Sequence, residues 1–236
     1  EPLLIRASSQ DASLLHAGRS SQDMFATYRA AIMRENLLDL AEQLSKTSET
    51  LVRLSEKHAQ TIVPNYTNGI AAQPNSLGHA WLGHAAGFER DAQRIREAYA
   101  RVDRSPMGTT VLNGTSWPLN RTRMAQYLGF EKIVDNAYDA SQISSSEYPV
   151  EVAAIVTSIG LHAGHFIQDV MSQYGQVRPW IFLVPLRFVN TQISSAMPQK
   201  QNPILLTETR REISSTLALA MGPIMRAHNI TPGMQD

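Results

Sequence analysis

The chain has 236 residues, and its 21 lysines and arginines balance 21 aspartates and glutamates, so the formal net charge is zero. That balance argues against broad binding to nucleic acid, which needs a surplus of basic side chains facing phosphates. The absence of cysteine excludes disulfides, thiolate metal sites and cysteine nucleophiles, and it favours a cytoplasmic protein.

No segment is expected to span a membrane. The longest apolar run without a charge lies between Glu151 and Asp169, which is shorter than the roughly 20 residues that a bilayer requires. The N-terminal residues lack the basic segment and apolar core of a signal peptide. The sequence begins without Met, which suggests a processed or partial chain.

The first half of the chain predicts a long helix. Apolar residues recur every three or four positions from Ala26 to Leu54, and no Gly or Pro interrupts residues 20–61. This pattern predicts one helix of some forty residues, about 60 Å long. Such a length is typical of a coiled-coil-like bundle.

Three further long helices are expected, which makes the fold class all-α. An apolar stripe over residues 77–99 predicts the second helix, and the segment 147–174 is apolar on nearly every face. Pro203 suits the first turn of the last helix, which runs to about residue 228 with a kink at residues 222–223. Because a helix that is apolar all round has to be buried, we place residues 147–174 at the centre of a bundle and expect several chains to pool their helices.

Few other elements are expected. Residues 121–128 predict a short helix, and residues 181–184 (Ile-Phe-Leu-Val) are the single strand candidate. Pro64 and Pro74 bound a loop between the first two long helices.

The candidate chemistry lies in residues 194–203, which read Ser-Ser-Ala-Met-Pro-Gln-Lys-Gln-Asn-Pro. This polar loop carries hydroxyls at one end, and Lys200 and Asn202 precede a helix. A helix N-terminus beside a lysine forms an anion site, and its field would make a neighbouring serine hydroxyl easier to ionise, as a base or nucleophile requires. On these residues alone, an ordinary loop with a helix cap is an equally good interpretation.

Residues 194–203 also resemble the Gly-Ser-Ser-x-Met-Pro-x-Lys-x-Asn-Pro signature of the fumarase/aspartase superfamily, with Ile193 in place of the glycine. Other segments are similar to the argininosuccinate lyase branch and follow its order over almost the whole chain. They are residues 16–20 (His-Ala-Gly-Arg-Ser), 63–67, 72–74, 78–79, 89–91, 105–108, 114–115, 128–130 and 235–236.

The resemblance implies a long-helix bundle in a homotetramer, with each active site assembled from three chains. It also implies that this chain is about half of the family's usual length. Residues 1–20 would be the remnant of an N-terminal region with the first active-site motif, and residues 21–236 the central helical domain. The family's small C-terminal domain would be absent.

The resemblance further implies a mechanism. Enzymes of the family remove a proton from the carbon next to a carboxylate, form a doubly negative aci-carboxylate, and release fumarate as the leaving group departs. Ser194 would be the base, while Lys200 and Asn202 would hold the growing charge, since preorganised donors and a cation stabilise such a dianion. Further substrate contacts are implied for Ser20, Thr67, Asn68, Gln73, Ser195 and Met197. The ligand would be a small dicarboxylate, and no cofactor or metal is expected.

Three positions depart from the argininosuccinate lyase pattern. Ser21 stands where the branch has an arginine that clamps a carboxylate, Asn68 replaces a histidine suited to proton donation, and Ile193 replaces the glycine. These changes favour an N-substituted aspartate-like substrate other than argininosuccinate, whose leaving amine carries its own proton. The alternative is a non-catalytic scaffold, as in the lens crystallins of this branch.

Four histidines invite a functional interpretation that we do not favour. His162 and His165 have metal-compatible spacing, but no acidic residue lies on the same helix face, so polar groups in a bundle core are preferred. A structural role is also preferred for His79 and His84. For Ser20 and Thr67, helix capping is the alternative to substrate contact.

Overall fold

The computed structural model describes residues 2–184 and 189–230, so residues 235–236 of the resemblance lie outside it. Packing divides the chain into two compact units. Unit 1 comprises Glu1–Leu40, Ile95–Val152 and Pro223–Asp236, and unit 2 comprises Ala41–Arg94 and Ala153–Gly222. The boundary expected after residue 20 stays a prediction, because this division follows packing alone.

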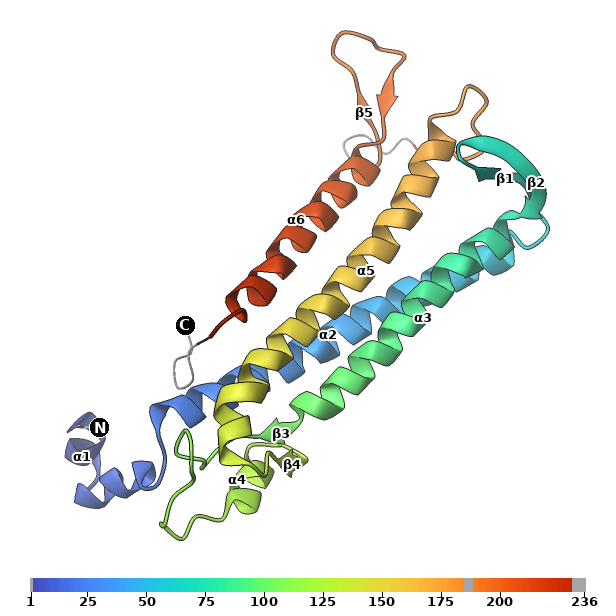
Figure 1. Cartoon of the computed structure of the whole chain (residues 1–236). Coiled ribbons are helices and arrows are strands. Elements are labelled where there is room, and N and C mark those ends of the chain that lie inside the picture. Colours follow the sequence, from blue (N-terminus) through green and yellow to red (C-terminus); the bar gives the residue numbers. More distant parts are fainter. Residues whose placement is uncertain (1, 185–188, 231–236) are drawn as a thin grey trace. The chain divides into compact units, whose positions relative to one another are not determined.

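The all-α fold class is confirmed by four long helices (Figure 1), all of them at the expected positions. They are α2 (Ser21–Lys57), α3 (Leu77–Val102), α5 (Ser144–Tyr174) and α6 (Ile204–Arg226). Each of these helices runs from one unit into the other.

The shorter helices lie in unit 1. They are α1 (Pro2–Ala7), the 3-10 helix η1 (Gln10–His16), α4 (Arg121–Tyr127) and the π-helical turn η2 (Asp139–Ile143). Helix α4 confirms the short helix predicted from the sequence. It begins there because the Asn120 side chain accepts a hydrogen bond from the Arg123 amide at 2.8 Å.

Each unit has its own apolar core. The core of unit 1 takes buried side chains from α2, α3, α4 and the segments around β4, namely Ala26, Ala30, Leu37, Ile95, Ala98, Val102, Ala125, Phe130 and Val134. Arg34 lies at the edge of this core. The Arg34 guanidinium is 4.0 Å from the Phe130 ring centroid and pairs with the Asp103 carboxylate at 2.5 Å. The core of unit 2 contains Leu44, Leu51, Leu77, Ala85, Phe88, Ala153, Ile155, Val170 and Leu206. The helical periodicity therefore selected the buried faces correctly.

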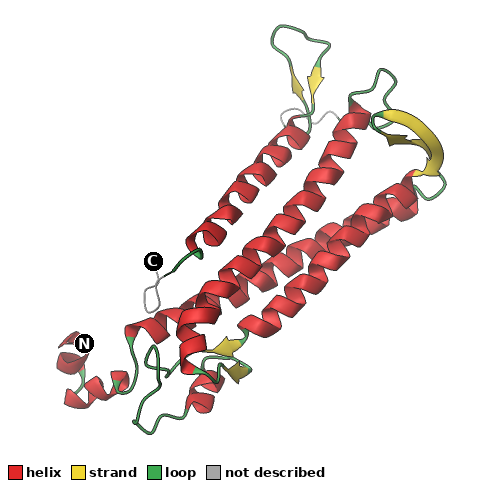
Figure 2. Cartoon of the chain, in the orientation of Figure 1, coloured by secondary structure: helices red, strands yellow, loops and turns green. Residues whose placement is uncertain are grey.

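The loop expected between the first two long helices is a β-hairpin, which corrects the prediction (Figure 2). Strands β1 (Ile62–Thr67) and β2 (Ile70–Ser76) pair antiparallel, with Pro64 opposite Pro74. The turn residues Asn68 and Gly69 have φ of 53° and 78°, the left-handed pair that joins a two-residue hairpin. The Asn-Gly dipeptide favours such a turn, but proline is uncommon inside strands, so the two prolines led to the prediction of a loop.

The predicted strand at residues 181–184 is wrong, because this segment has no regular secondary structure. A short apolar run becomes a strand only when a partner strand completes its hydrogen bonds. The remaining strands in the described part of the chain are two-residue pieces. Strand β3 (Arg104–Ser105) pairs with β4 (Lys132–Ile133) in parallel, and β5 (Gln192–Ile193) pairs with β6 (Gln201–Asn202) antiparallel.

Helix α5 also departs from expectation. By length and composition, the segment Asp139–Tyr174 could cross a membrane, contrary to the expectation that no segment would qualify. Only 17% of its most apolar window is buried by its own chain. A buried core helix of a soluble protein passes the same test, so length and composition alone do not distinguish the two.

We predict that Gly69→Ala lowers the free energy of unfolding by about 1 kcal/mol, because a side chain disfavours the left-handed conformation that the turn requires. No atom lies near the added Cβ, so the loss would report backbone strain alone. Urea denaturation measures it. Gly83→Ala is the control, since Gly83 lies in α3 with equally open space, and alanine there should stabilise. Equal effects of both substitutions would contradict the turn assignment.

Candidate active site

Residues 194–200 form the loop of a short hairpin that leads into α6 (Figure 1). Ile193 pairs with Gln201, and Gln192 pairs with Asn202. The Ser194 amide donates to the Lys200 carbonyl at 3.1 Å and closes the loop. The predicted base and the predicted cation are therefore brought to the same end of the hairpin.

The main chain of Met197 holds both ends of this loop. Its amide donates to the Ser194 hydroxyl oxygen at 3.2 Å, and its carbonyl accepts from the Lys200 amide at 2.9 Å. Ser194 is half-buried, whereas Ser195, Met197 and Lys200 are exposed. In the part of the chain that the structure describes, no titratable side chain hydrogen-bonds to Ser194.

The base of the hairpin is anchored to its neighbours in unit 2. The Tyr174 hydroxyl donates to the Gln201 carbonyl at 2.9 Å, and the Leu205 amide lies 3.4 Å from the Asn190 carbonyl. Asn202 is half-buried and stands two residues before the start of α6. The start of α6 therefore contributes partial positive charge at the base of the hairpin, and Lys200 adds a positive charge in its loop.

Ser20 lies in unit 1 at the start of α2, where the structure confirms the capping interpretation. Its hydroxyl oxygen accepts from the Gln22 amide at 3.3 Å, and its own amide donates to the Asp23 carboxylate at 2.9 Å. Ser20 therefore caps the helix through the amide two residues on, and Asp23 reaches back to the Ser20 amide as the acidic residue of a capping box does. Because the hydroxyl acts there as an acceptor, its proton is left for a further partner.

Thr67, Asn68 and Gln73 lie on the hairpin of β1 and β2. Thr67 ends β1 and Asn68 begins the turn, and both side chains are exposed. Thr67 is therefore not a helix cap, which removes the alternative considered for it. Gln73 is exposed farther along β2, opposite Asn65.

The predicted site residues form three separate groups. Ser20 belongs to unit 1, whereas the two hairpins belong to unit 2. Within the described residues, no hydrogen bond joins the hairpin of β1 and β2 to residues 194–202. The structure thus places Ser194, Lys200 and Asn202 in one hairpin of unit 2.

The sequence analysis missed a buried carboxylate in unit 2. Asp91 is fully buried on α3 and accepts hydrogen bonds from Ser158 at 2.7 Å, His162 Nδ1 at 2.6 Å and Arg94 at 2.8 Å. His162 lies on α5, and its acidic partner Asp91 lies on α3. The sequence analysis considered only acidic residues on the same helix face as His162, and this contact comes from another helix. His162 is part-buried and hydrogen-bonds to Asp91, in line with the structural role preferred for it, whereas His165 is exposed and is not a core group.

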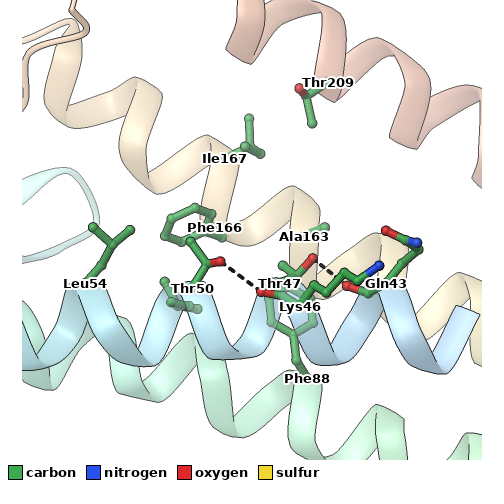
Figure 3. Close-up of a pocket in the computed structure, with 11 residues that line it drawn as sticks. Gln43, Lys46, Thr47, Thr50, Leu54, Phe88, Ala163, Phe166, Ile167 and Thr209 are labelled. Atoms are coloured by element: carbon green, nitrogen blue, oxygen red, sulfur yellow. Dashed lines mark hydrogen bonds between the residues drawn. The ribbon is translucent and has the colours of Figure 1, made fainter.

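A cavity of about 450 Å³ lies in unit 2 and is lined mainly by apolar surface (Figure 3). The hydroxyls of Thr47 and Thr50 bond to the carbonyls of Gln43 and Lys46 on their own helix, each at 2.9 Å. Among the other lining residues are Leu51, Leu54, Phe88, Ala163, Phe166 and Ile167. None of the predicted site residues lines it, and its surface suits an apolar side chain better than a dicarboxylate.

A polar cavity of about 530 Å³ lies in unit 1 and likewise contains no predicted site residue. Burial raises the pKa of its Tyr148 hydroxyl, and the hydrogen-bonded Glu151 carboxylate raises the pKa of the Arg101 guanidinium. Arg101 Nε contacts both Glu151 oxygens, at 2.9 and 3.1 Å. This pairing neutralises one of the two arginines that line the cavity.

Comparison with known proteins gives consistent results. Residues 5–216 match the family model described as Lyase. Argininosuccinate lyase of Methanosarcina acetivorans is 31% identical over 224 residues, which are 93% of this chain and 43% of that protein. The chain thus spans less than half the length of this curated relative.

Solved structures agree on the fold. The crystal structure of EDDS lyase in complex with formate has a TM-score of 0.88 and 26% identity, and the match covers 97% of this chain and 45% of that one. An EDDS lyase variant with bound fumarate has a TM-score of 0.85 and 25% identity, covering 98% and 46%.

Proposed function

We propose that this chain, which belongs to the fumarase/aspartase superfamily on its argininosuccinate lyase-like branch, is the central part of a carbon–nitrogen lyase that releases fumarate from an N-substituted aspartate. The observation that carries this proposal is the hairpin in which Ser194 and Lys200 meet just before the N-terminus of α6. The formate and fumarate held by EDDS lyase structures support a small carboxylate as ligand.

Ser194 acts as the base in this proposal. As an alkoxide, its Oγ takes the proton from the substrate carbon next to a carboxylate, and the C–H electrons move into that carboxylate as the aci dianion. In the second step the C–N bond breaks, fumarate forms, and the nitrogen leaves with the bonding electrons. The Met197 amide, 3.2 Å from Ser194 Oγ, favours the ionised hydroxyl because it donates to the oxygen.

Lys200, Asn202 and the first turn of α6 hold the dianion. In this proposal, the lysine, the asparagine amide and the start of the helix supply the donors and the positive charge that stabilise the anion. Lys200 is exposed in the single chain, and in water a pair of charges 4 Å apart gains only about 1 kcal/mol. A covering surface that excludes water would make the same lysine a far stronger stabiliser.

Neighbouring copies of the chain are our proposed source of that cover. A homotetramer would combine the three separate groups, Ser20, the Thr67–Gln73 hairpin and the Ser194–Asn202 hairpin, in shared active sites. It would also cover α5, whose apolar window is only 17% buried by its own chain. The apolar cavity of unit 2 offers further surface for such packing. We place the assembly in the cytoplasm, because a chain without cysteine forms no disulfides and so needs no oxidising compartment.

The substrate is proposed to be an aspartate derivative other than argininosuccinate. Asn68 supplies no titratable group to a leaving amine, and Ser21 offers no guanidinium for a second carboxylate. Ser195, Met197, Thr67 and Gln73 would contact the remainder of the substrate. An amine that departs with its own proton needs no histidine. The similarity to a lyase named for EDDS supports a substrate range wider than argininosuccinate.

A non-catalytic scaffold is the second candidate. Asn68 favours it, because its left-handed conformation at the hairpin turn gives this asparagine a purely structural reason to be there.

We predict that Ser194→Ala lowers the kcat for fumarate release by about a hundredfold or more, the usual loss when a general base is removed. Absorbance of fumarate in the ultraviolet follows the rate. Ser214→Ala is the matched control, because Ser214 is an exposed serine of α6 whose hydroxyl bonds only to its own helix; its kcat should not change. An unchanged rate in Ser194→Ala would refute the assignment of the base.

The substrate prediction is tested with the full-length protein, fumarate and a panel of primary amines and diamines. We expect fumarate to be consumed with at least one amine and argininosuccinate to be cleaved poorly or not at all. Robust cleavage of argininosuccinate would contradict the substrate class. No consumption with any amine, together with no cleavage of argininosuccinate, would leave the scaffold.

Sedimentation velocity tests the assembly. We expect a tetramer, and we expect Leu161→Lys to shift the distribution to smaller species, because Leu161 is a half-exposed leucine on α5 and a lysine there resists burial. A monomer that remains fully helical would contradict the pooling of helices.

A further inference from the structure

Asp23 is a fully buried carboxylate in unit 1 that the sequence analysis did not select. Its Oδ1 accepts from the Ser20 amide at 2.9 Å, and its Oδ2 accepts from the amides of Gly108 and Thr110, each at 3.0 Å. Both oxygens are thus committed to main-chain donors. A carboxylate that accepts several amides in a dry site makes stronger bonds than a neutral acceptor does.

Helix capping accounts for only one of these bonds. The capping box needs the contact with Ser20, three residues earlier in the chain. The other two bonds reach a segment 85 and 87 residues away. Asp23 therefore ties the start of α2 to a distant loop, which a capping residue has no need to do.

That loop has a conformation that requires support. Thr110 and Val111 have φ of 50° and 76°, and a β-branched residue in the left-handed region is a genuine outlier. Such strain persists where the surrounding contacts over-determine the backbone, and it concentrates at functional sites. Here the Thr110 amide donates to Asp23, and its hydroxyl donates to the Gly18 carbonyl at 2.7 Å.

The loop is also held from its other side. Arg121 donates to the carbonyls of Met107 at 3.1 Å and Val134 at 2.6 Å. The Gly108 backbone lies so close to Arg121 and Met124 that a Cβ there would clash with the Met124 side chain at 2.6 Å. Residues 18–20 therefore face a loop that is fixed by contacts on both sides.

We infer that Asp23 is the positioning residue for Ser20, and that it fixes the Ser20 hydroxyl and the 108–111 loop as one rigid element of the substrate site. This inference rests on the proposed function, in which Ser20 contacts the substrate. The three amides stabilise the carboxylate by donating hydrogen bonds to it, and they hold the Ser20 main chain against the loop. The Ser20 hydroxyl keeps its proton to donate.

The kinetic test is Asp23→Asn in the full-length protein. Asparagine keeps the shape but presents one acceptor and one donor group, so one of the three amides then faces an N–H group. We expect KM to rise about tenfold with kcat changed much less, the pattern for a lost contact that ground state and transition state share.

Asp91→Asn is the matched control, because Asp91 is an equally buried carboxylate with three partners in unit 2. It should lower stability and leave KM unchanged.

A double variant separates positioning from general damage. If Asp23 acts through Ser20, Ser20→Ala combined with Asp23→Asn has the KM of Ser20→Ala alone, because the second change then has nothing left to misplace. Additive effects, or an unchanged KM in Asp23→Asn, would overturn the inference.

Hydrogen exchange tests the same inference without any activity. In Asp23→Asn, the amides of Ser20, Gly108 and Thr110 should exchange about tenfold faster than in the parent protein, while amides near Asp91 keep their rates. Unchanged exchange at these three amides would overturn the positioning role. A parent protein without lyase activity would overturn the proposed function, and the exchange rates would still decide whether Asp23 couples Ser20 to the loop.

Discussion

Covering an apolar helix is the constraint on which this chain depends. Helix α5 is 31 residues long and carries apolar side chains on nearly every face, yet its own chain buries only 17% of its most apolar window. Water penalises such a surface in proportion to its area. In the homotetramer that we propose, neighbouring copies would cover this helix and would also combine the separate groups of site residues.

The chemistry of the candidate active site obeys the same constraint. Asn202 stands at the base of the hairpin, two residues before α6, and Ser194 and Lys200 meet at its loop end. In one chain that end is largely open to water, where charge–charge interactions are weak. A lyase that stabilises a dianion needs the same groups in a dry setting, so assembly and catalysis are parts of one requirement in the function we propose.

Each unit contains a buried carboxylate that links segments distant in the chain. Asp91 gathers Ser158, His162 and Arg94 in unit 2, and Asp23 gathers the amides of Ser20 and of a strained loop in unit 1. In both places a buried charge is satisfied by several donors, which is the condition under which such burial is tolerated. The carboxylates fix segments that lie far apart in the chain, so their role is to orient helices and loops.

The sequence by itself determined the helices, their buried faces and the loop with Ser194 and Lys200, because these depend on periodicity and on neighbours only a few residues away. It also contained the Asn-Gly turn of the hairpin, although the prolines around it suggested a plain loop. Only the tertiary structure decided that Asp91 reaches His162 across helices and that Asp23 reaches Gly108 and Thr110. Contacts between distant segments depend on how the helices pack against one another, and local pattern carries no information about that packing.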